Sequence, residues 1–443
     1  MRTSALARLA IMGVLLLALM GPLLMIESVV SERAQRRDQA VREISAVWGG
    51  AQTIGGPILT VPYQYSWTDN KGQVRQGDGR AYFLPSALDI SSTLESQIRS
   101  RGIFEAVVYT AHVTMTGRFA RPDWSAIRPV PDRIAWDQAT IDVGISDPRG
   151  ITRRLTVTGN GVEEACMPGA GEPGLIDSGV HAPLRGYSAS SVPVTFSMQI
   201  DVNGTRELRF LPAGDETTVR LESTWPHPSF SGAPLPETRQ VRANGFSASW
   251  RVPYFARGYA QAWSAAAVNQ DRMRGQAEAS AFGVALIRPV DIYQQAERAV
   301  KYAALFIVMT FVIAFLWEIG RGALLHPVQY LFLGFAMCVF YLLLVSFSER
   351  IGFDVAYATA AGATIALLAW YWSRIVTGRW QGPLMAIVLS AVYSYLYLLL
   401  RLEDYALLAG SVGLFVMLAL VMFFTRRVNW YDLRLGSANE GRT

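Results

Sequence analysis

The chain has 443 residues, of which 51% are hydrophobic and 17% are charged, and its formal net charge is +5. Residues 27–300 hold 28 of the 40 basic and 28 of the 35 acidic residues, so this large polar part is neutral. A nucleic-acid-binding protein needs a basic face on its soluble domain, so the charge distribution argues against nucleic acid as a partner.

The first element in chain order is an apolar run, Leu9–Ile26, without a charged residue. About 20 apolar residues in a helix cross a hydrocarbon core of about 30 Å, so this run is long enough to span a membrane. We expect residues 1–26 to be a cytoplasmic tip and an uncleaved signal anchor. A cleaved signal peptide is the alternative, although the run exceeds the usual apolar length and no A-x-A site follows.

Residues 27–300 are predicted to form one domain, mainly β with helical ends. Glu27–Val47 has no Gly or Pro and is expected to extend the first helix. Short runs with period-two alternation then predict an antiparallel sandwich or a barrel-like domain. The expected strands are Ile58–Ser66, Ala106–Phe119, Ile141–Ile145, Leu155–Thr158, Val192–Val202, Glu207–Leu211, Thr217–Ser223 and Gly245–Val252. Asn160-Gly161 and Asn203-Gly204 are expected turns, and the Ala-rich stretch Tyr254–Glu278 is expected to be helical.

Five apolar runs follow and predict a five-helix transmembrane bundle over residues 301–425, with a tail at 426–443. The runs are Tyr302–Trp317, Val328–Phe347, Val355–Ser373, Trp380–Leu400 and Tyr405–Thr425. The fold class is therefore an α+β membrane protein with six transmembrane helices and a β-rich domain between the first and the second.

Arginine residues near the ends of the runs predict the orientation, because basic residues concentrate on the cytoplasmic side. With both termini inside, nine arginines lie on the cytoplasmic side and only Arg350 and Arg401 lie outside. The nine are Arg2, Arg8, Arg321, Arg374, Arg379, Arg426, Arg427, Arg434 and Arg442. We therefore expect an inner-membrane protein whose residues 27–300 are periplasmic.

The sequence predicts no catalytic, cofactor or metal site. The four histidines, His112, His181, His227 and His326, are scattered and form no HExxH or HxH motif. GxSxG and SxxK motifs do not occur in a strand–turn–helix context. The two cysteines, Cys166 and Cys338, are predicted to lie outside and inside the membrane, so they are not expected to pair.

The apolar runs contain no ionisable residue, and Glu318, just after the second run, is expected to reach toward the membrane surface. Tyr393 and Tyr397 share a helix face. They line a pore or, in the alternative that we favour, they make hydrogen bonds between helices. The pattern indicates an anchor more than a transport pathway.

One loop is a candidate partner-binding site. Residues 224–230 read TWPHPSF, and four prolines lie between positions 226 and 236. Proline stiffens such a loop, and exposed aromatic side chains suit partner binding. The candidate residues are Trp225, Pro226, His227, Pro228 and Phe230. The alternative is that the aromatic side chains close the base of the sandwich.

A second candidate site lies where the polar domain meets the bundle. Arg298 and Lys301 are expected to couple the two parts, with Asp291 or Glu297 as partners. The alternative is ordinary snorkelling of long basic side chains at the membrane surface.

Many residues in order resemble one known family. From the polar domain to the start of the bundle they are Glu32-Arg33-Ala34, Gly56-Pro57, Gly179-Val180-His181, TWPHPSF at 224–230, Pro289, Asp291, Tyr293, Arg298 and Lys301-Tyr302-Ala303. In the bundle they are Leu325-His326-Pro327, Gln329-Tyr330-Leu331, Phe340–Leu344, Ser348-Glu349, Gly352-Phe353, Thr425-Arg426 and Trp430-Tyr431. The chain also has one apolar run before the polar domain and five after it. With this layout and these residues, it resembles the CreD family of bacterial inner-membrane proteins over nearly its full length.

The resemblance implies a role in cell-envelope integrity and envelope-stress response, without an established catalytic residue. We therefore expect a non-enzymatic protein, without cofactors, whose periplasmic domain binds an envelope component, a periplasmic protein or a membrane protein. The lipid bilayer is its other partner. The alternative is a permease or channel component that uses the C-terminal bundle. The sequence does not indicate an oligomeric state.

Overall fold

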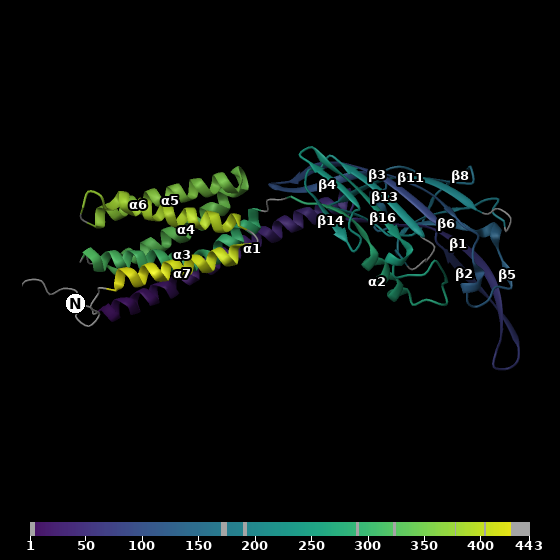
Figure 1. Ribbon diagram of the computed structural model, residues 1–443, viewed down its shortest axis with the longest axis horizontal. Coiled ribbons are helices and arrows are strands. Elements are labelled where there is room, and N and C mark those ends of the chain that lie inside the picture. The colour runs from purple at the N-terminus through teal and green to yellow at the C-terminus, as the bar shows by residue number, and fades with distance from the viewer. Residues whose placement is uncertain are drawn as a thin grey trace, which may run out of the picture. The chain divides into compact units, whose positions relative to one another are not determined.

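The computed structural model describes residues 5–169, 175–188, 193–288, 292–321, 325–376, 378–402 and 405–426. The chain divides into two compact units. A helical unit comprises Met1–Arg36 and Val290–Thr443, and a β-rich unit comprises Arg37–Pro289. Figure 1 shows the helices of the first and the sheets of the second. The predicted α+β fold class, with a β-rich domain between the first and second apolar helices, is confirmed.

The helical unit contains long apolar helices that lie alongside one another (Figure 1). They are α1 (Ala5–Trp48), α3 (Ile292–Arg321), α4 (Pro327–Ile351), α5 (Phe353–Ile375), α6 (Gln381–Arg401) and α7 (Ala406–Thr425). Among the described residues, five of these helices are long and apolar enough to cross a membrane. The sixth predicted run forms α7, whose apolar part, Leu408–Phe423, is shorter.

Helix α1 continues well past its apolar run, as the absence of Gly and Pro in Glu27–Val47 predicts. Local signals also fix the start of α4. His326 caps the helix, and its main-chain N–H donates a hydrogen bond to Gln329 Oε1 at 2.9 Å. Pro327 occupies the first turn, where its missing N–H costs nothing.

The β-rich unit contains two sheets. The ten-stranded sheet has the order β14 (Pro228–Gly232), β18 (Phe282–Leu286), β12 (Glu207–Phe210), β1 (Gln52–Thr68), β6 (Thr140–Ile145), β10 (Gly179–Pro183) and β9 (Met167–Pro168). Beside this path, β2 (Val74–Phe83) pairs with β1 and with β17 (Ala262–Ser264), and β5 (Arg133–Ile134) pairs with β1. The eight-stranded sheet has the order β15 (Thr238–Arg242), β16 (Gly245–Pro253), β13 (Glu216–Ser223), β3 (Ala87–Arg101), β4 (Phe104–Phe119), β11 (Val194–Thr205), β7 (Thr156–Gly159) and β8 (Val162–Ala165).

Side chains from both sheets form one hydrophobic core, which makes the unit a sandwich. Strand β3 alternates buried and exposed positions, with Leu88, Ile90 and Leu94 pointing into the core. The pairing is mostly antiparallel, but β1 pairs with β12 and β13 pairs with β3 in parallel. The short helices of this unit are α2 (Gln270–Ser280) and four single turns, Trp124–Ala126, Trp136–Gln138, Pro148–Gly150 and Tyr254–Ala256.

Two local predictions for this unit are wrong. Asn203-Gly204 is not a hairpin turn, because β11 continues to Thr205 and the chain changes sheets at Arg206, which has a φ of 68°. Tyr254–Glu278 is not one helix, because only the part from Gln270 belongs to α2 and Ala262–Ser264 is a strand. The other predicted turn, Asn160-Gly161, does join β7 to β8, and both of its residues have positive φ.

Candidate functional site

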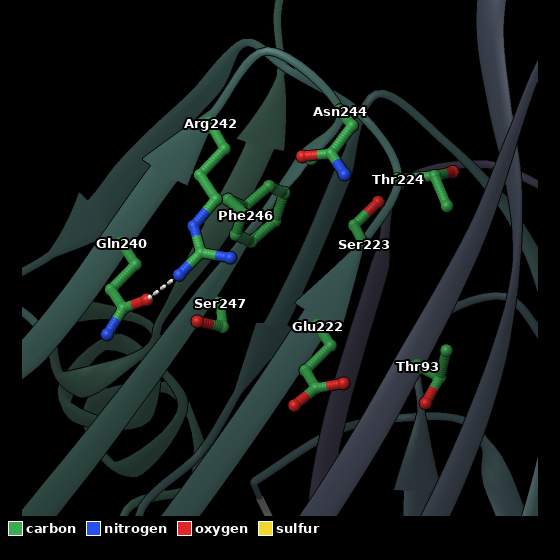
Figure 2. Close-up of a pocket in the computed structure, with 10 residues that line it drawn as sticks. Thr93, Glu222, Ser223, Thr224, Gln240, Arg242, Asn244, Phe246 and Ser247 are labelled. Atoms are coloured by element: carbon green, nitrogen blue, oxygen red, sulfur yellow. Dashed lines mark hydrogen bonds between the residues drawn. The ribbon is translucent and has the colours of Figure 1, made fainter.

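A polar hollow of about 330 Å³ lies on the eight-stranded sheet and is the candidate binding site (Figure 2). Its lining comes from four neighbouring strands and two turns, in the order β15, β16, β13 and β3. The lining residues are Thr93, Glu222, Ser223, Thr224, Gln240, Arg242, Asn244, Gly245, Phe246 and Ser247. The hollow therefore presents a carboxylate, a guanidinium, two amides and several hydroxyl groups.

The charged groups of the hollow, Glu222 and Arg242, come from different strands. Gln240 and Arg242 line one side, Thr93 lines the other, and Glu222 and Ser247 lie between them (Figure 2). The guanidinium of Arg242 donates a hydrogen bond to Gln240 Oε1 at 2.9 Å. Both charged side chains are exposed. A polar ligand can therefore meet an anionic and a cationic group in one place.

At the bottom of the hollow, its lining residues pack against the core of the sandwich. Phe246 is buried and its ring meets that of Phe230 edge-on, with ring centroids 5.8 Å apart. Ser223 is buried and its hydroxyl donates to the main-chain oxygen of Leu94 at 3.1 Å. These contacts fix β16 and β13, the two central strands of the four that line the hollow, so the site is largely preformed.

A solvent-facing row of side chains continues from the hollow across the sheet. Strand register places Gln240, Ser247, Glu222, Thr93, His112 and Asp201 opposite one another in that order. His112 Nδ1 lies 2.7 Å from Asp201 Oδ1, and Nε2 lies 3.7 Å from Glu95 Oε1. His112 is thus a partly exposed surface histidine with carboxylate neighbours, and it lies beside Asp201, the last residue of this row.

The candidate loop of residues 224–230 borders the hollow through Thr224, but its aromatic side chains face the core. Trp225 and Phe230 pack against the core cluster, and Trp225 Nε1 donates to the main-chain oxygen of Ile287 at 2.9 Å. Pro228 and Phe230 belong to strand β14, which pairs with β18. His227 is exposed and Pro226 is half-buried. The packing favours the alternative interpretation for Trp225 and Phe230, while partner binding by the loop stays a prediction.

The residues of the second candidate site lie on or near α3. Lys301 Nζ pairs with Glu297 Oε1, one helical turn earlier, at 2.8 Å. Arg298 is on the same helix and is half-buried, and Asp291 lies outside the described residues. Coupling between the units through these side chains stays a prediction.

Several tyrosines of the bundle donate hydrogen bonds to neighbouring helices. Tyr357 on α5 donates to the main-chain oxygen of Tyr393 on α6 at 2.6 Å, and Tyr397 donates to Asp354 at 3.0 Å. Tyr395 donates to the main-chain oxygen of Ala409 on α7 at 2.5 Å. The contact of Tyr397 agrees with the interpretation that the hydroxyl groups join helices. The buried hydroxyl of Tyr393 has no hydrogen-bond partner among the described residues, so this interpretation does not hold for Tyr393.

Glu318 on α3 is buried against neighbouring helices, while its expected reach toward the membrane surface stays a prediction. Its side chain is 2% exposed and forms an ion pair with Arg8 on α1. The hydroxyl of Tyr330 on α4 donates to Glu318 Oε2 at 2.9 Å, and the main-chain N–H of Leu325 donates to Oε1 at 3.4 Å. Arg8 is 310 positions away in sequence, so this partner could not be found by considering each apolar run of the sequence separately.

Across the described part of the chain, no group of three or more His, Cys, Asp or Glu side chains has the arrangement to hold a metal ion. Both cysteines, Cys166 and Cys338, are free. Burial raises the pKa of the Cys166 thiol to about 11, so at neutral pH it is a protonated and weakly nucleophilic group.

Sequence comparison identifies one family. Residues 4–431 match the profile of the family described as inner membrane protein CreD. The inner membrane protein CreD of Escherichia coli (strain K12) is 31% identical over 430 residues, which cover 96% of this chain and 93% of that protein.

Solved structures give only weak likenesses. An M1 zinc metallopeptidase from Deinococcus radiodurans is 13% identical, with 39% of this chain and 41% of that chain aligned and a TM-score of 0.19. A two-domain M1 zinc metallopeptidase bound to L-tryptophan is 11% identical, with 70% of this chain and 87% of that chain aligned and a TM-score of 0.19. Similarity at this level supports no argument about fold or function.

Proposed function

Because this chain belongs to the CreD family of inner membrane proteins, we propose that it contributes to cell-envelope integrity and stress tolerance by binding, not by catalysis. In this proposal both termini are cytoplasmic and the β-rich unit is periplasmic. That unit binds an envelope component or a partner protein at the polar hollow of Figure 2.

The observation that carries the proposal is the chemistry of the hollow. Glu222 and Arg242 offer opposite charges, while Gln240 and Asn244 offer amide donors and acceptors. A volume of about 330 Å³ suits a short polar segment, such as a few sugar or amino-acid units. Such groups are abundant on the molecules that surround a periplasmic domain, and the neutral charge of residues 27–300 places no general barrier to them.

The test uses the full-length protein in detergent and isolated peptidoglycan sacculi as the probe. We expect the protein to sediment with sacculi, and we expect Glu222→Gln with Arg242→Gln to reduce the bound fraction at least five-fold, because charge-assisted hydrogen bonds are lost. Arg239→Gln with Glu237→Gln is the matched control, since these residues are on or beside β15 but outside the lining.

A photo-crosslinking residue placed at Ser247 in cells distinguishes a protein partner from a wall component. The hollow is assigned to protein binding when an identified protein meets two conditions. It crosslinks from Ser247 but not from Gln76 on β2, and this crosslink is lost in the Glu222→Gln, Arg242→Gln variant. If the double variant changes neither sedimentation nor crosslinking, and the envelope-stress phenotype also persists, the hollow is not the binding site.

A second function, a permease or channel component, is favoured by one observation, the buried carboxylate of Glu318 inside the bundle. Its test is proton flux into vesicles that contain the purified protein and the pH-sensitive dye pyranine. Flux that falls when Tyr393 and Tyr397 become phenylalanine supports this function. Flux equal to that of empty vesicles rejects proton transport.

A further inference from the structure

The contact between Glu318, Arg8 and Tyr330 brings together three helices that are far apart in the sequence. Arg8 belongs to α1, Glu318 to α3 and Tyr330 to α4. Glu318 is 2% exposed and Arg8 is 17% exposed, so the pair is shielded from solvent. Both Glu318 oxygens accept hydrogen bonds, Oε2 from Tyr330 at 2.9 Å and Oε1 from Arg8 and from the Leu325 main chain.

Apolar packing alone only weakly favours one register of α1 against its neighbouring helices. Its run Leu9–Ile26 is apolar on every side, and lipid tails solvate such a surface about as well as a neighbouring helix does. Apart from one close contact, between Leu19 and Gly334, a helix of this kind can rotate or slide by one turn at small cost. A polar contact with a single geometry removes that freedom, because every slipped register leaves a charge unpaired.

The middle of α1 has a complementary steric contact. Leu19 is 1% exposed and lies against Gly334 of α4, where a Cβ added to the glycine would approach Leu19 Cδ1 to 2.1 Å. Four other buried side chains of α1 that belong to the core of the bundle, Met12, Leu23, Ile26 and Val30, follow the same face. At the other end of this face, Arg33 Nε lies 3.8 Å from Glu349 Oε1. The notch at Gly334 therefore holds Leu19 in the same register in which Arg8 reaches Glu318.

We propose that Arg8, Glu318 and Tyr330 form a buried polar pin that fixes the register of α1 against α3 and α4. The pin keeps the first apolar segment as a permanent helix of the bundle, held by charge as well as by packing. Its residues are positioning residues, and the proposal is independent of ligand binding at the polar hollow.

The experiment measures register directly in membranes by cysteine crosslinking of the full-length protein. Cys166→Ser and Cys338→Ala provide a cysteine-free background. Cysteine pairs then join position 334 to position 19, or to positions 15 and 23, which lie one turn on either side. The last two pairs also carry Leu19→Ala, so that the side chain added at position 334 has room. With the pin intact, we expect a short thiol crosslinker to favour the 19–334 product.

Glu318→Gln and Arg8→Ala are expected to lower the ratio of the 19–334 product to the 15–334 and 23–334 products about ten-fold, which corresponds to about 1.4 kcal/mol. The charge exchange of Arg8→Glu with Glu318→Arg is expected to restore part of the ratio. Arg36→Ala, whose ion pair with Glu32 is exposed, is the matched control and leaves the ratio unchanged.

A variant with apolar replacements distinguishes loss of the α1 register from loss of the whole fold. Arg8→Met with Glu318→Leu removes both charges, and such replacements usually preserve stability. We expect this variant to accumulate normally in the membrane while its crosslinks spread over positions 15, 19 and 23. A ratio that stays at the original value in this variant and in Glu318→Gln overturns the proposal.

Discussion

The two units of the molecule differ in one kind of charged contact, a buried ion pair between side chains. In the β-rich unit most ion pairs lie at the surface, such as Arg251 with Glu216, which are 64% and 59% exposed. In the helical unit Glu318 is buried and paired with Arg8. Water weakens the first kind of pair, while the second has no solvent to replace a lost partner. Exposed pairs such as Arg36 with Glu32 occur in the helical unit as well, but its buried pair also specifies packing.

Arg257 is an exception within the β-rich unit and follows the same physical rule. Its side chain is fully buried, donates to the main-chain oxygen of Ala213 at 2.6 Å, and lies over the rings of Tyr254 and Tyr259. Burial lowers its pKa, and Tyr259, Asp215 and Tyr254 partly offset that effect by favouring the charged form. A buried charge in either unit thus has specific partners.

The largest expected effect tests whether the β-rich unit depends on its apolar core. Trp250 is 1% exposed and its ring meets those of Phe230 and Phe282. Trp250→Ala is expected to cost about 3–5 kcal/mol of unfolding free energy through lost burial and a cavity. Denaturant unfolding of the full chain, followed by proteolysis of the β-rich unit, measures it. Val241→Ala, at an exposed position of β15, is the control. Simultaneous loss of the helical unit would mean that the units are not independent.

A smaller effect is expected from overpacking the helical unit. Gly334→Leu forces α1 away from α4, because Leu19 already fills that space, and is expected to cost about 1–3 kcal/mol. Thermal aggregation of the detergent-solubilised protein measures the loss. Gly362→Leu on α5 is the control, since nothing lies within 4 Å of the added carbon. Equal melting of the two variants would show that α1 does not pack closely there.

A still smaller effect appears only at high pH. Burial raises the pKa of Cys166 from 9.0 to about 11. Its contribution to stability is complete below pH 9, and it is lost as the pH rises toward 11, because the unfolded chain ionises first. In a Cys338→Ala background, we expect the rate of alkylation by iodoacetamide to keep rising up to about pH 11. A plateau near pH 9 would show that the thiol is solvated.

The smallest effect is expected at a surface ion pair. Arg251 Nε lies 3.5 Å from Glu216 and 3.9 Å from Glu237, and all three side chains are exposed. Arg251→Gln should change the unfolding free energy by no more than about 0.5 kcal/mol, and added salt should reduce even that. A loss above about 1 kcal/mol in the denaturation midpoint analysis would contradict the contrast between the units.

Much of this fold can be predicted from the sequence where the local pattern is strong. The apolar runs and the extension of α1 are examples, because both depend on neighbouring residues. Strand β3 is not predicted, because the polar residue Ser92 occupies a buried position and interrupts the alternation of apolar and polar residues that includes Leu88, Ile90 and Leu94. The stretch after Tyr254 suggests a helix by its alanines, but Arg257 binds the Ala213 carbonyl and holds the chain in a loop.

The candidate site is harder to predict, because its residues come from separate segments. Thr93, Glu222 and Arg242 meet only through the pairing of β3, β13, β16 and β15. The aromatic side chains of residues 224–230 are conspicuous in the sequence, yet Trp225 and Phe230 face the core while Thr224 borders the hollow. Sequence alone does not say which face of a strand or loop meets solvent when both kinds of residue are present.

The strand order of the ten-stranded sheet has a consequence for how the protein is made. Strand β18 (Phe282–Leu286) lies between β12 and β14, and it is the last strand of that sheet along the chain. A ribosome produces β1, β12 and β14 before it produces the strand that joins the latter two. The nascent chain therefore carries unpaired edges on β12 and β14 until residue 286 emerges. Unpaired strand edges can form hydrogen bonds with the wrong strand during this time. A truncation before Phe282 leaves this sheet unfinished, whatever the length of chain already synthesised.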